Sequence, residues 1–242
     1  MSSLSVSESF YSIQGEGSTM GRPSVFLRLA GCNLMCGGQG TQFDEELHNG
    51  ATWRCDTLEV WTKGRSKKFE EVLSEDLVDR LKQGANLIVT GGEPLMQQKR
   101  ICLYLDYLKE IVGPDLSVEI ETNGTIMPSQ DLIWHNVQFN CSPKLANSGN
   151  DKDQYFVPNV IQKINKANSI FKFVVGSTDD WSEIESLYLE HMDRKKIWIM
   201  PAGENQDLLE QSKPFAVEVA IENCVNYSTR IHIDIWNKKT GV

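Results

Sequence analysis

Three cysteines near the N-terminus have the residue type and spacing most suited to metal chemistry. Three residues separate Cys32 from Cys36, and Cys55 begins the string Cys55-Asp56-Thr57. Three thiolates leave one iron of a four-iron cluster without a protein ligand, and an open coordination site allows a metal centre to do chemistry. The same trio with His48 as a fourth ligand would suit a structural zinc site. The cysteines alone therefore leave iron–sulfur and zinc open.

A glycine pair follows an apolar run further along the chain. Thr90-Gly91-Gly92-Glu93-Pro94 comes directly after the apolar residues 87–89. Glycine has no Cβ, so the backbone at such a pair can approach a small ligand closely. Together with the cysteines, this segment predicts a redox cluster beside a small-molecule pocket.

The elements that must position these residues alternate between strands and helices. Apolar runs predict strands, and 3.6-residue patterns predict helices between most of them. The predicted strands are residues 25–29, 86–90, 116–121, 137–141, 170–175, 196–200 and 230–235, and the predicted helices are 75–83, 97–112, 158–168, 179–192 and 208–224. Such alternation implies an α/β fold with a mostly parallel sheet, open or closed into a barrel. No repeat or linker is visible, so we expect one domain over residues 1–242.

Glycine and polar residues follow the predicted strands. In parallel α/β folds, ligands collect at the C-terminal ends of the strands. The segments at these ends are Gly31-Cys32, Gly91-Gly92-Glu93-Pro94, Glu121-Thr122-Asn123-Gly124, Ser142-Pro143-Lys144, Gly176-Ser177 and residues 201–204. Any one of them could be an ordinary turn. Their recurrence along one rim of the sheet favours a binding site.

Composition excludes several classes of protein. The net charge of −9 argues against nucleic-acid binding, which needs a basic face. No apolar run has the roughly 18 residues of a membrane span, and no secretion signal is visible, so we expect a cytoplasmic enzyme without disulfides. Cys102, Cys141 and Cys224 lie in apolar stretches and are expected to be buried structural thiols.

The longer motifs form a specific combination. They are residues 10–17 (Phe-Tyr-Ser-Ile-Gln-Gly-Glu-Gly), 26–34 (Phe-Leu-Arg-Leu-Ala-Gly-Cys-Asn-Leu), 55–57, 89–94, 121–124, 142–144 and 230–233. With them the chain resembles, over nearly its whole length, the 7-carboxy-7-deazaguanine synthase family of the radical S-adenosylmethionine (SAM) superfamily. Gln-Gly-Glu-Gly combined with Cys-Asp-Thr is specific, whereas Gly-Gly-Glu-Pro alone indicates only the superfamily. The resemblance implies a single-domain partial (β/α) radical-SAM barrel whose strands are mostly parallel.

The cysteine spacing departs from the superfamily pattern. That pattern is Cys-x3-Cys-x2-Cys, whereas eighteen residues separate Cys36 from Cys55 here. The intervening residues 37–54 are rich in glycine and polar side chains, which is typical of a loop or a short lobe. Because the entropy cost of closing a loop grows slowly with its length, we expect this enlarged cluster loop to be compatible with ligation by all three thiolates.

The resemblance also implies the cofactor contacts. Cys32, Cys36 and Cys55 would hold a [4Fe–4S] cluster, whose fourth iron would bind the amino and carboxylate groups of SAM. Thr57 matches the position that ligates Mg²⁺ in the family, and a hydroxyl oxygen suits a hard cation, although a threonine in a turn is the simpler alternative. Arg54 stands where the family has an aromatic residue, so we expect its contact through the backbone. The SAM contacts implied are Arg54, Cys55, Asp56, Gly91, Gly92, Glu93, Ser142, Pro143 and Lys144.

Substrate contacts follow from the same resemblance. They are Ile13, Gln14, Gly15, Glu16, Arg28, Thr90 and His232. Arg28 shares a strand face with Phe26 and Ala30, and its guanidinium fits a substrate carboxylate, the alternative being an arginine that reaches to water. An amide and a carboxylate at Gln14 and Glu16 can bind the polar edge of a pterin. His232, on the predicted last strand, is either a substrate ligand or part of a solvated face.

The reaction implied is conversion of 6-carboxy-5,6,7,8-tetrahydropterin to 7-carboxy-7-deazaguanine with loss of ammonia, in queuosine and deazapurine biosynthesis. The reduced cluster would donate an electron to SAM, and the resulting radical would abstract hydrogen from the pterin. We expect a carbon–nitrogen lyase, an electron donor such as flavodoxin, and a homodimer. Two alternatives remain: another radical SAM enzyme such as a glycyl-radical activase, and a non-catalytic zinc-binding module.

Overall fold

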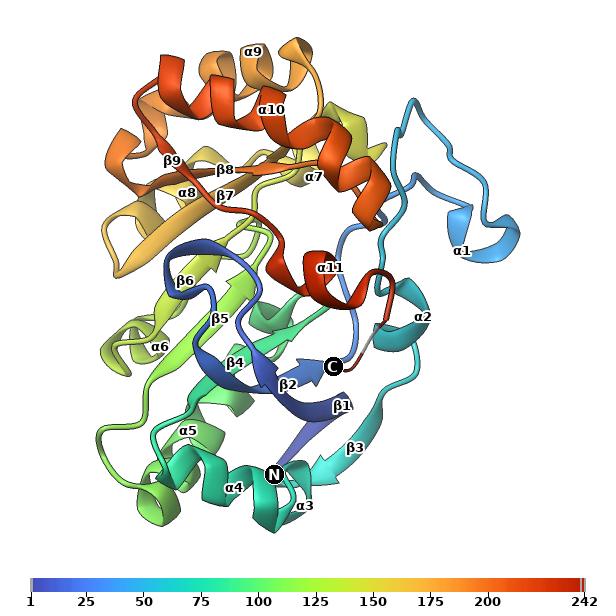
Figure 1. Cartoon of the computed structure of the whole chain (residues 1–242). Coiled ribbons are helices and arrows are strands. Elements are labelled where there is room, and N and C mark those ends of the chain that lie inside the picture. Colours follow the sequence, from blue (N-terminus) through green and yellow to red (C-terminus); the bar gives the residue numbers. More distant parts are fainter. Residues whose placement is uncertain (1, 240, 242) are drawn as a thin grey trace.

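A single twisted sheet runs through the molecule, with helices packed along its outside (Figure 1). The computed structural model describes residues 2–239 and 241. Their strands are β1 (Ser3–Ile13), β2 (Pro23–Leu29), β3 (Arg65–Lys68), β4 (Asn86–Gly91), β5 (Val118–Thr122), β6 (Gln138–Cys141), β7 (Ser169–Val175), β8 (Ile197–Pro201) and β9 (Asn226–Tyr227). The order across the sheet is β3-β1-β2-β4-β5-β6-β7-β8-β9. β1 is antiparallel to β2 and β3, whereas all pairs from β2 to β9 are parallel.

The sheet is open, so the expected partial barrel with mostly parallel strands is confirmed. Its helices are α1 (Thr41–Asp44), α2 (Leu58–Trp61), α3 (Phe69–Val72), α4 (Glu75–Lys82), α5 (Gln98–Val112), α6 (Gln130–Trp134), α7 (Lys152–Tyr155), α8 (Pro158–Asn165), α9 (Thr178–Leu187), α10 (Gln206–Glu222) and α11 (Ile231–Trp236). Short 3-10 turns are η1 (Gly17–Thr19), η2 (Pro94–Gln97), η3 (Ala146–Ser148), η4 (Leu189–His191) and η5 (Arg194–Lys196). Within the described residues, no helix combines the length and the apolar character needed to cross a membrane.

Six of the seven predicted strands are confirmed to within two residues, as β2 and β4–β8. The five predicted helices correspond to α4, α5, α8, α9 and α10, although α8 and α9 end earlier than expected. N-caps explain where several helices begin. Ser129, Ser177 and Asn205 each accept a backbone N–H from the first turn of the helix that follows.

The seventh predicted strand, residues 230–235, is wrong. This segment forms the helix α11, with Arg230 at its N-cap. Six residues that alternate polar and apolar side chains fit a period of two, but the segment has no partner strand, since it leaves β9 and crosses back to the loop after β1. There the backbone N–H of Ile231 donates to the carbonyl of Gly15 at 3.0 Å. Only Ile233 of its three isoleucines is buried, at 4% exposure.

Alternation along the strands gives the sheet two different faces. One face packs beneath the helices and builds the core from residues such as Leu27, Val89, Ile120, Phe139 and Phe171. The neighbouring positions point to the opposite side, which we call the polar face. It consists of Arg28 on β2, Thr90 on β4, Glu119 and Glu121 on β5, Asn140 on β6 and Lys172 on β7. The fold thus places a row of polar side chains across five parallel strands.

Candidate active site

The structure brings the three N-terminal cysteines together at the C-terminal end of β2. The backbone N–H of Cys55 donates to the carbonyl of Cys36 at 3.1 Å, so these two residues are adjacent despite the insertion between them. Burial raises the pKa of Cys32 to about 11, and the nearby charge of Cys55 adds to this rise. Burial likewise raises the pKa of Cys36 to about 12, with contributions from both other cysteines. Each thiol is therefore within electrostatic reach of its neighbours.

Residues 37–54, which form the insertion, are held against the segment after β6. The N–H of Gly37 donates to the carbonyl of Ser148 at 2.9 Å, and that of Thr52 donates to the carbonyl of Asn147 at 2.9 Å. The indole N–H of Trp53 donates to Oδ1 of Asn147, also at 2.9 Å. Figure 1 shows the short helix α1 (light blue) standing out from the sheet within this insertion. The insertion is a short lobe that is anchored beside the cysteines at both of its ends.

The glycine pair lies directly against the first cysteine. A Cβ on Gly91 would lie 2.1 Å from the carbonyl oxygen of Leu29, and one on Gly92 would lie 2.7 Å from Cβ of Cys32. No side chain fits in either place. The N–H of Glu93 donates to the carbonyl of Gly31 at 2.8 Å, which ties the end of β4 to the end of β2. The two predicted cofactor segments thus form one continuous wall.

Glu93 is buried behind this wall, at 1% exposure. Its carboxylate accepts hydrogen bonds from the N–H of Leu95 at 2.9 Å, the hydroxyl of Thr122 at 2.9 Å and the N–H of Asn123 at 2.7 Å. Burial raises the pKa of Glu93 to about 6, although these hydrogen bonds oppose the rise. Glu93 therefore links the strand ends of β4 and β5, and its charge adds to the rise in the pKa of Cys32.

A lysine supplies positive charge beside the cysteines. The ammonium of Lys144 donates to Oγ of Ser142 at 3.3 Å and lies 5.8 Å from the ring centre of Trp53. Its charge lowers the pKa of both Cys32 and Cys36 against the larger effect of burial. A cation in this place favours thiolates and bound anions. Ser142 and Lys144 thus occupy the same rim as the glycine pair, as the sequence predicts.

The three cysteines and His48 are the side chains that could hold either a four-iron cluster or zinc. Within residues 2–239 and 241, no three His, Cys, Asp or Glu side chains converge closely enough to hold a single metal ion. A four-iron cluster has a different requirement, because each thiolate binds a separate iron and the sulfur atoms remain apart. His48, the fourth ligand of the zinc alternative, instead bonds Asp44, with Nε2 at 2.9 Å from Oδ2. The residues present therefore fit a cluster better than zinc.

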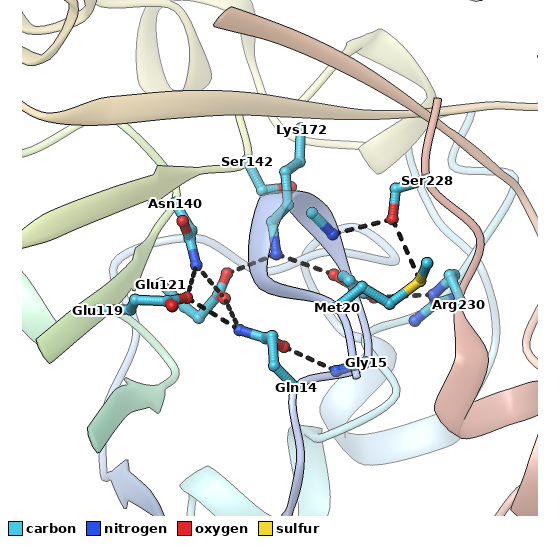
Figure 2. Close-up of polar contacts among 12 residues, drawn as sticks. Gln14, Gly15, Met20, Glu119, Glu121, Asn140, Ser142, Lys172, Ser228 and Arg230 are labelled. Carbon is cyan, nitrogen blue, oxygen red and sulfur yellow. Dashed lines mark hydrogen bonds and ion pairs between the residues drawn. The ribbon is translucent and has the colours of Figure 1, made fainter. Parts of the chain in front are cut away.

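The polar face carries a network of charged and amide groups (Figure 2). Lys172, at 2% exposure, donates to Glu16 at 2.9 Å and to Glu121 at 2.7 Å. Asn140 donates to Glu119 at 2.6 Å and to Glu121 at 3.0 Å. Burial alone would lower the pKa of Lys172, but the two carboxylates raise it. A buried ammonium between two carboxylates is a fixed, directional arrangement suited to holding a polar ring.

The loop after β1 completes this network. Gln14 donates its amide to Glu119 at 3.2 Å and to Glu121 at 3.1 Å. Burial alone would raise the pKa of Glu16, but Lys172 and Arg230 together hold it well below its usual value. Arg230 donates to Glu16 at 3.0 Å and to Asp56 at 3.2 Å. One arginine therefore connects the loop after β1 with the string that begins at Cys55.

The other predicted substrate residues occupy the same region. Arg28 and Thr90 are paired across β2 and β4. The guanidinium Nε of Arg28 donates to Glu8 at 2.8 Å, and its side chain is 14% exposed. The imidazole of His232 packs on Gly15, since a Cβ there would lie 2.1 Å from Nδ1. Burial lowers the pKa of His232. The alternative of a solvated strand face for His232 is wrong, because this residue lies on α11.

Two predicted cofactor residues have less direct positions. The side chain of Arg54 bonds Glu59 at 2.6 Å and Oγ1 of Thr41 at 3.2 Å, so its guanidinium is engaged by the protein. Thr57, at the N-cap of α2, places Oγ1 3.6 Å from Sγ of Cys55.

Of the remaining cysteines, Cys102 and Cys141 are buried as expected, but Cys224 is exposed, so the expectation of burial is wrong there.

Sequence reasoning missed Glu119, Asn140 and Lys172 as site residues. Their signal was a charged or amide side chain at alternate positions of otherwise apolar strands, such as Lys172 within Ile-Phe-Lys-Phe-Val. An unpaired charge is costly to bury, so such a residue indicates a partner on a neighbouring element. The sequence places Arg230 only within the motif 230–233 and the predicted strand 230–235, and its contacts depend on the crossing of the C-terminal segment over the sheet.

The chain is similar to known proteins over nearly its whole length. No family model matches. The 7-carboxy-7-deazaguanine synthase of Pyrobaculum aerophilum is 31% identical over 239 residues, covering 98% of this chain and 96% of that protein. The protein of the same name from Clostridium acetobutylicum is 31% identical over 246 residues, covering 98% of each. Among solved structures, QueE from Escherichia coli superposes with a TM-score of 0.62 at 23% identity, covering 94% of this chain and 93% of that one, and so shares the fold.

These two curated relatives are similar to the chain over almost their entire length. By this similarity, the chain belongs to the 7-carboxy-7-deazaguanine synthase family.

Proposed function

We propose that this chain catalyses the radical ring contraction of 6-carboxy-5,6,7,8-tetrahydropterin to 7-carboxy-7-deazaguanine, as a carbon–nitrogen lyase of the radical SAM superfamily. Loss of ammonia balances the reaction, so no net oxidant is required. When bound, a [4Fe–4S] cluster and SAM supply the radical that abstracts hydrogen from the pterin. The contribution of the protein is to bind these groups, orient them and exclude water.

One observation supports this proposal above the others. The cysteine segment and the glycine pair form one wall, and the polar face begins on the same strands, since Arg28 and Thr90 precede Cys32 and Gly91 by only a few residues. A cofactor held by the wall would therefore lie next to a substrate held by the polar face. A zinc-binding module would not need a polar face beside its metal site.

The cofactor side of the site uses three kinds of group. Cys32, Cys36 and Cys55 would hold the cluster through their thiolates. The backbone of Gly91 and Gly92 would contact the methionine part of SAM, and the ammonium of Lys144 suits its carboxylate. The other SAM contacts we propose are Glu93, Ser142, Pro143, Asp56 and the backbone of Arg54.

The substrate side uses the network shown in Figure 2. The amide of Gln14 and the carboxylates of Glu16 and Glu121 offer acceptors and donors that match the amino-pyrimidinone edge of a pterin. Lys172 fixes both carboxylates from one point, so the recognition surface is preorganised. Ile13, Gly15 and His232 would close the same pocket from the loop after β1 and from α11.

We also propose that Thr57 ligates Mg²⁺ through Oγ1 and that the ion orients the substrate carboxylate. The hydroxyl oxygen of Thr57 lies 3.6 Å from Sγ of Cys55, and this position beside the cysteine segment supports the proposal. Turnover that is unchanged after magnesium is removed by a chelator would contradict this role.

The proposal includes a flavodoxin-like electron donor and a homodimer, the latter measurable by sedimentation.

Arg28 provides a test of the substrate side. We expect Arg28→Ala to raise KM for the pterin about 10–100-fold, because a charge-assisted bidentate contact contributes roughly 1.5–3 kcal/mol. Among the described residues, Arg28 bonds Glu8 through Nε alone, so the two outer nitrogens of its guanidinium are available to a carboxylate. The matched control Glu8→Gln retains the guanidinium and should alter KM far less. An unchanged KM in Arg28→Ala would remove the assignment.

The function itself is tested by anaerobic incubation of the reconstituted protein with SAM, a reductant, Mg²⁺ and the carboxypterin. We expect mass analysis to show 7-carboxy-7-deazaguanine and free ammonia. Protein that is brown and contains iron and sulfide, but leaves the pterin intact, would instead favour another radical SAM activity such as a glycyl-radical activase. Colourless protein that contains zinc would favour the binding module.

A further inference from the structure

Two side chains from separate elements direct N–H groups at cysteine sulfurs. The indole Nε1 of Trp61, at the end of α2, donates to Sγ of Cys55 at 3.5 Å. The amide Nδ2 of Asn150, which follows η3, donates to Sγ of Cys36 at 3.7 Å. These distances suit the larger radius of sulfur. The two contacts reach the cysteines on either side of the insertion.

Among residues 2–239 and 241, Sγ of Cys55 is the only acceptor for the indole N–H of Trp61. An indole nitrogen can only donate, and Trp61 is 7% exposed, so its donor lies in a buried environment. The backbone N–H of Trp61 donates to the carbonyl of Thr57 at 3.1 Å, and its own carbonyl accepts from Gly31 at 3.1 Å. The ring is therefore fixed relative to the segments of both Cys55 and Cys32.

The orientation of the Asn150 amide is set by its oxygen. Oδ1 accepts the backbone N–H of Met35 at 2.9 Å, which leaves Nδ2 on the side of Cys36. Nδ2 also donates to Oγ of Ser148 at 3.1 Å. A flipped amide would place its oxygen against the sulfur and its NH₂ against a backbone N–H, losing both bonds. Asn150 thus presents a defined donor to the second thiol.

A thiolate that binds iron has no proton, so its hydrogen bonds come only from donors in the protein. Reduction of an iron–sulfur cluster adds negative charge that spreads over the sulfurs. N–H donors stabilise this charge and raise the reduction potential. In a buried site with a low effective dielectric, their effect is greater than in water. The two donors therefore act on the step in which an external one-electron donor reduces the cluster.

We propose that Trp61 and Asn150 are positioning residues that raise the reduction potential of the cluster held by Cys32, Cys36 and Cys55. This inference rests on the proposed function, since it requires the cluster. Through N–H···S bonds to Cys55 and Cys36, the two residues make the oxidised cluster easier to reduce by a protein donor. They touch neither SAM nor the pterin in this role.

The principal test is the midpoint potential of the reconstituted holoenzyme, measured by anaerobic redox titration with electron paramagnetic resonance. Trp61→Phe retains an aromatic ring but lacks the N–H. We expect its one-electron reduction constant to fall by up to about tenfold, which corresponds to about 59 mV toward negative potential. The matched control is Trp53→Phe, which also loses an indole N–H, but one that is bonded to Asn147 rather than to sulfur. Its potential should equal that of the wild type.

Asn150→Ala gives an independent measurement on the other cysteine. It should shift the potential in the same direction. The control is Asn147→Ala, which should not shift it, because Asn147 lies nearby in η3 but its amide donates to Asp180 at 2.7 Å rather than to a cysteine sulfur. A third measurement needs no variant. Pulsed electron paramagnetic resonance of the reduced wild-type cluster should show a coupled proton that exchanges in deuterated water.

The outcomes separate the inference from the proposed function. A wild-type protein that assembles no four-iron cluster would overturn both. A cluster that forms normally but has the same potential in Trp61→Phe and Asn150→Ala as in the wild type would overturn the inference alone. Absence of an exchangeable coupled proton in the wild type would also overturn it, whatever the stability of the variants.

Discussion

Replacing Cys55 by alanine should reduce turnover below detection while leaving the fold intact. As a proposed cluster ligand, Cys55 would attach the cofactor, so the effect of its loss should far exceed the ~10–100-fold losses typical of residues that only support a ligand. The fold should survive because Cys55 lies in a loop, is only partly buried, and its backbone bond to Cys36 does not involve the side chain. Iron content, product formation and far-ultraviolet circular dichroism are the measurements.

The matched control for this substitution is Cys224→Ala. Cys224 is exposed and lies in the turn after α10, remote in sequence from the cluster segment. We expect it to retain full iron content and full turnover. Full turnover by Cys55→Ala, Cys32→Ala or Cys36→Ala would defeat the assignment of the cluster ligands. Unfolding of all three variants together with normal behaviour of the control would mean that these thiols serve the fold rather than the cofactor.

Lys172→Met should be the most destabilising single change on the polar face. It removes a buried ammonium that is bonded to Glu16 and Glu121 and leaves two carboxylates without their common partner. Breaking such a buried pair costs about 3–5 kcal/mol of the free energy of unfolding. We expect the pterin to lose binding as well, because both carboxylates lose their fixed positions. Anaerobic urea unfolding and pterin binding measure the two effects.

The loss of stability in Lys172→Met should depend on pH in a definite direction. The pKa of Glu16 is held below its ordinary value of 4.5, so its ion pair stabilises the wild type above that pH and loses this contribution as pH falls. The difference between wild type and variant should therefore be largest near neutral pH and shrink below about pH 4.5. A difference that grows in acid would contradict the role of Lys172. The control Lys238→Met breaks an exposed pair with Glu204 and should change little.

The central strands were predictable because hydrophobic alternation and buried apolar runs are local properties. β2 and β4–β8 were found in this way, and with them the rim on which Cys32, Gly92 and Lys144 lie. β1 was missed because Ser3–Ile13 is more than half polar, and its antiparallel pairing with β2 and β3 is a long-range property. The rim could be located from sequence because strand ends of a parallel sheet meet at one edge.

The buried network could not be derived in the same way. Contacts such as Lys172 with Glu16 join residues 156 positions apart, and only the fold determines which charges meet. The segment 230–235 failed for a different reason. Its six residues alternate polar and apolar side chains, and this local pattern fits a strand as well as it fits the short helix that forms. Its real constraint is Arg230, which binds Glu16 and Asp56 from outside the sheet and begins a helix there.

The hydrogen bond between Cys36 and Cys55 has a consequence for how this enzyme could be altered. It closes the insertion, residues 37–54, into a loop whose two ends lie side by side, so the approach of Cys36 to Cys55 does not depend on how the residues around α1 are arranged. Because the entropy of such a closed segment varies slowly with its length, peptides of other sizes could be exchanged here. The part of the insertion around α1 is therefore a suitable attachment point for a tag, a reporter or a tether to a partner enzyme.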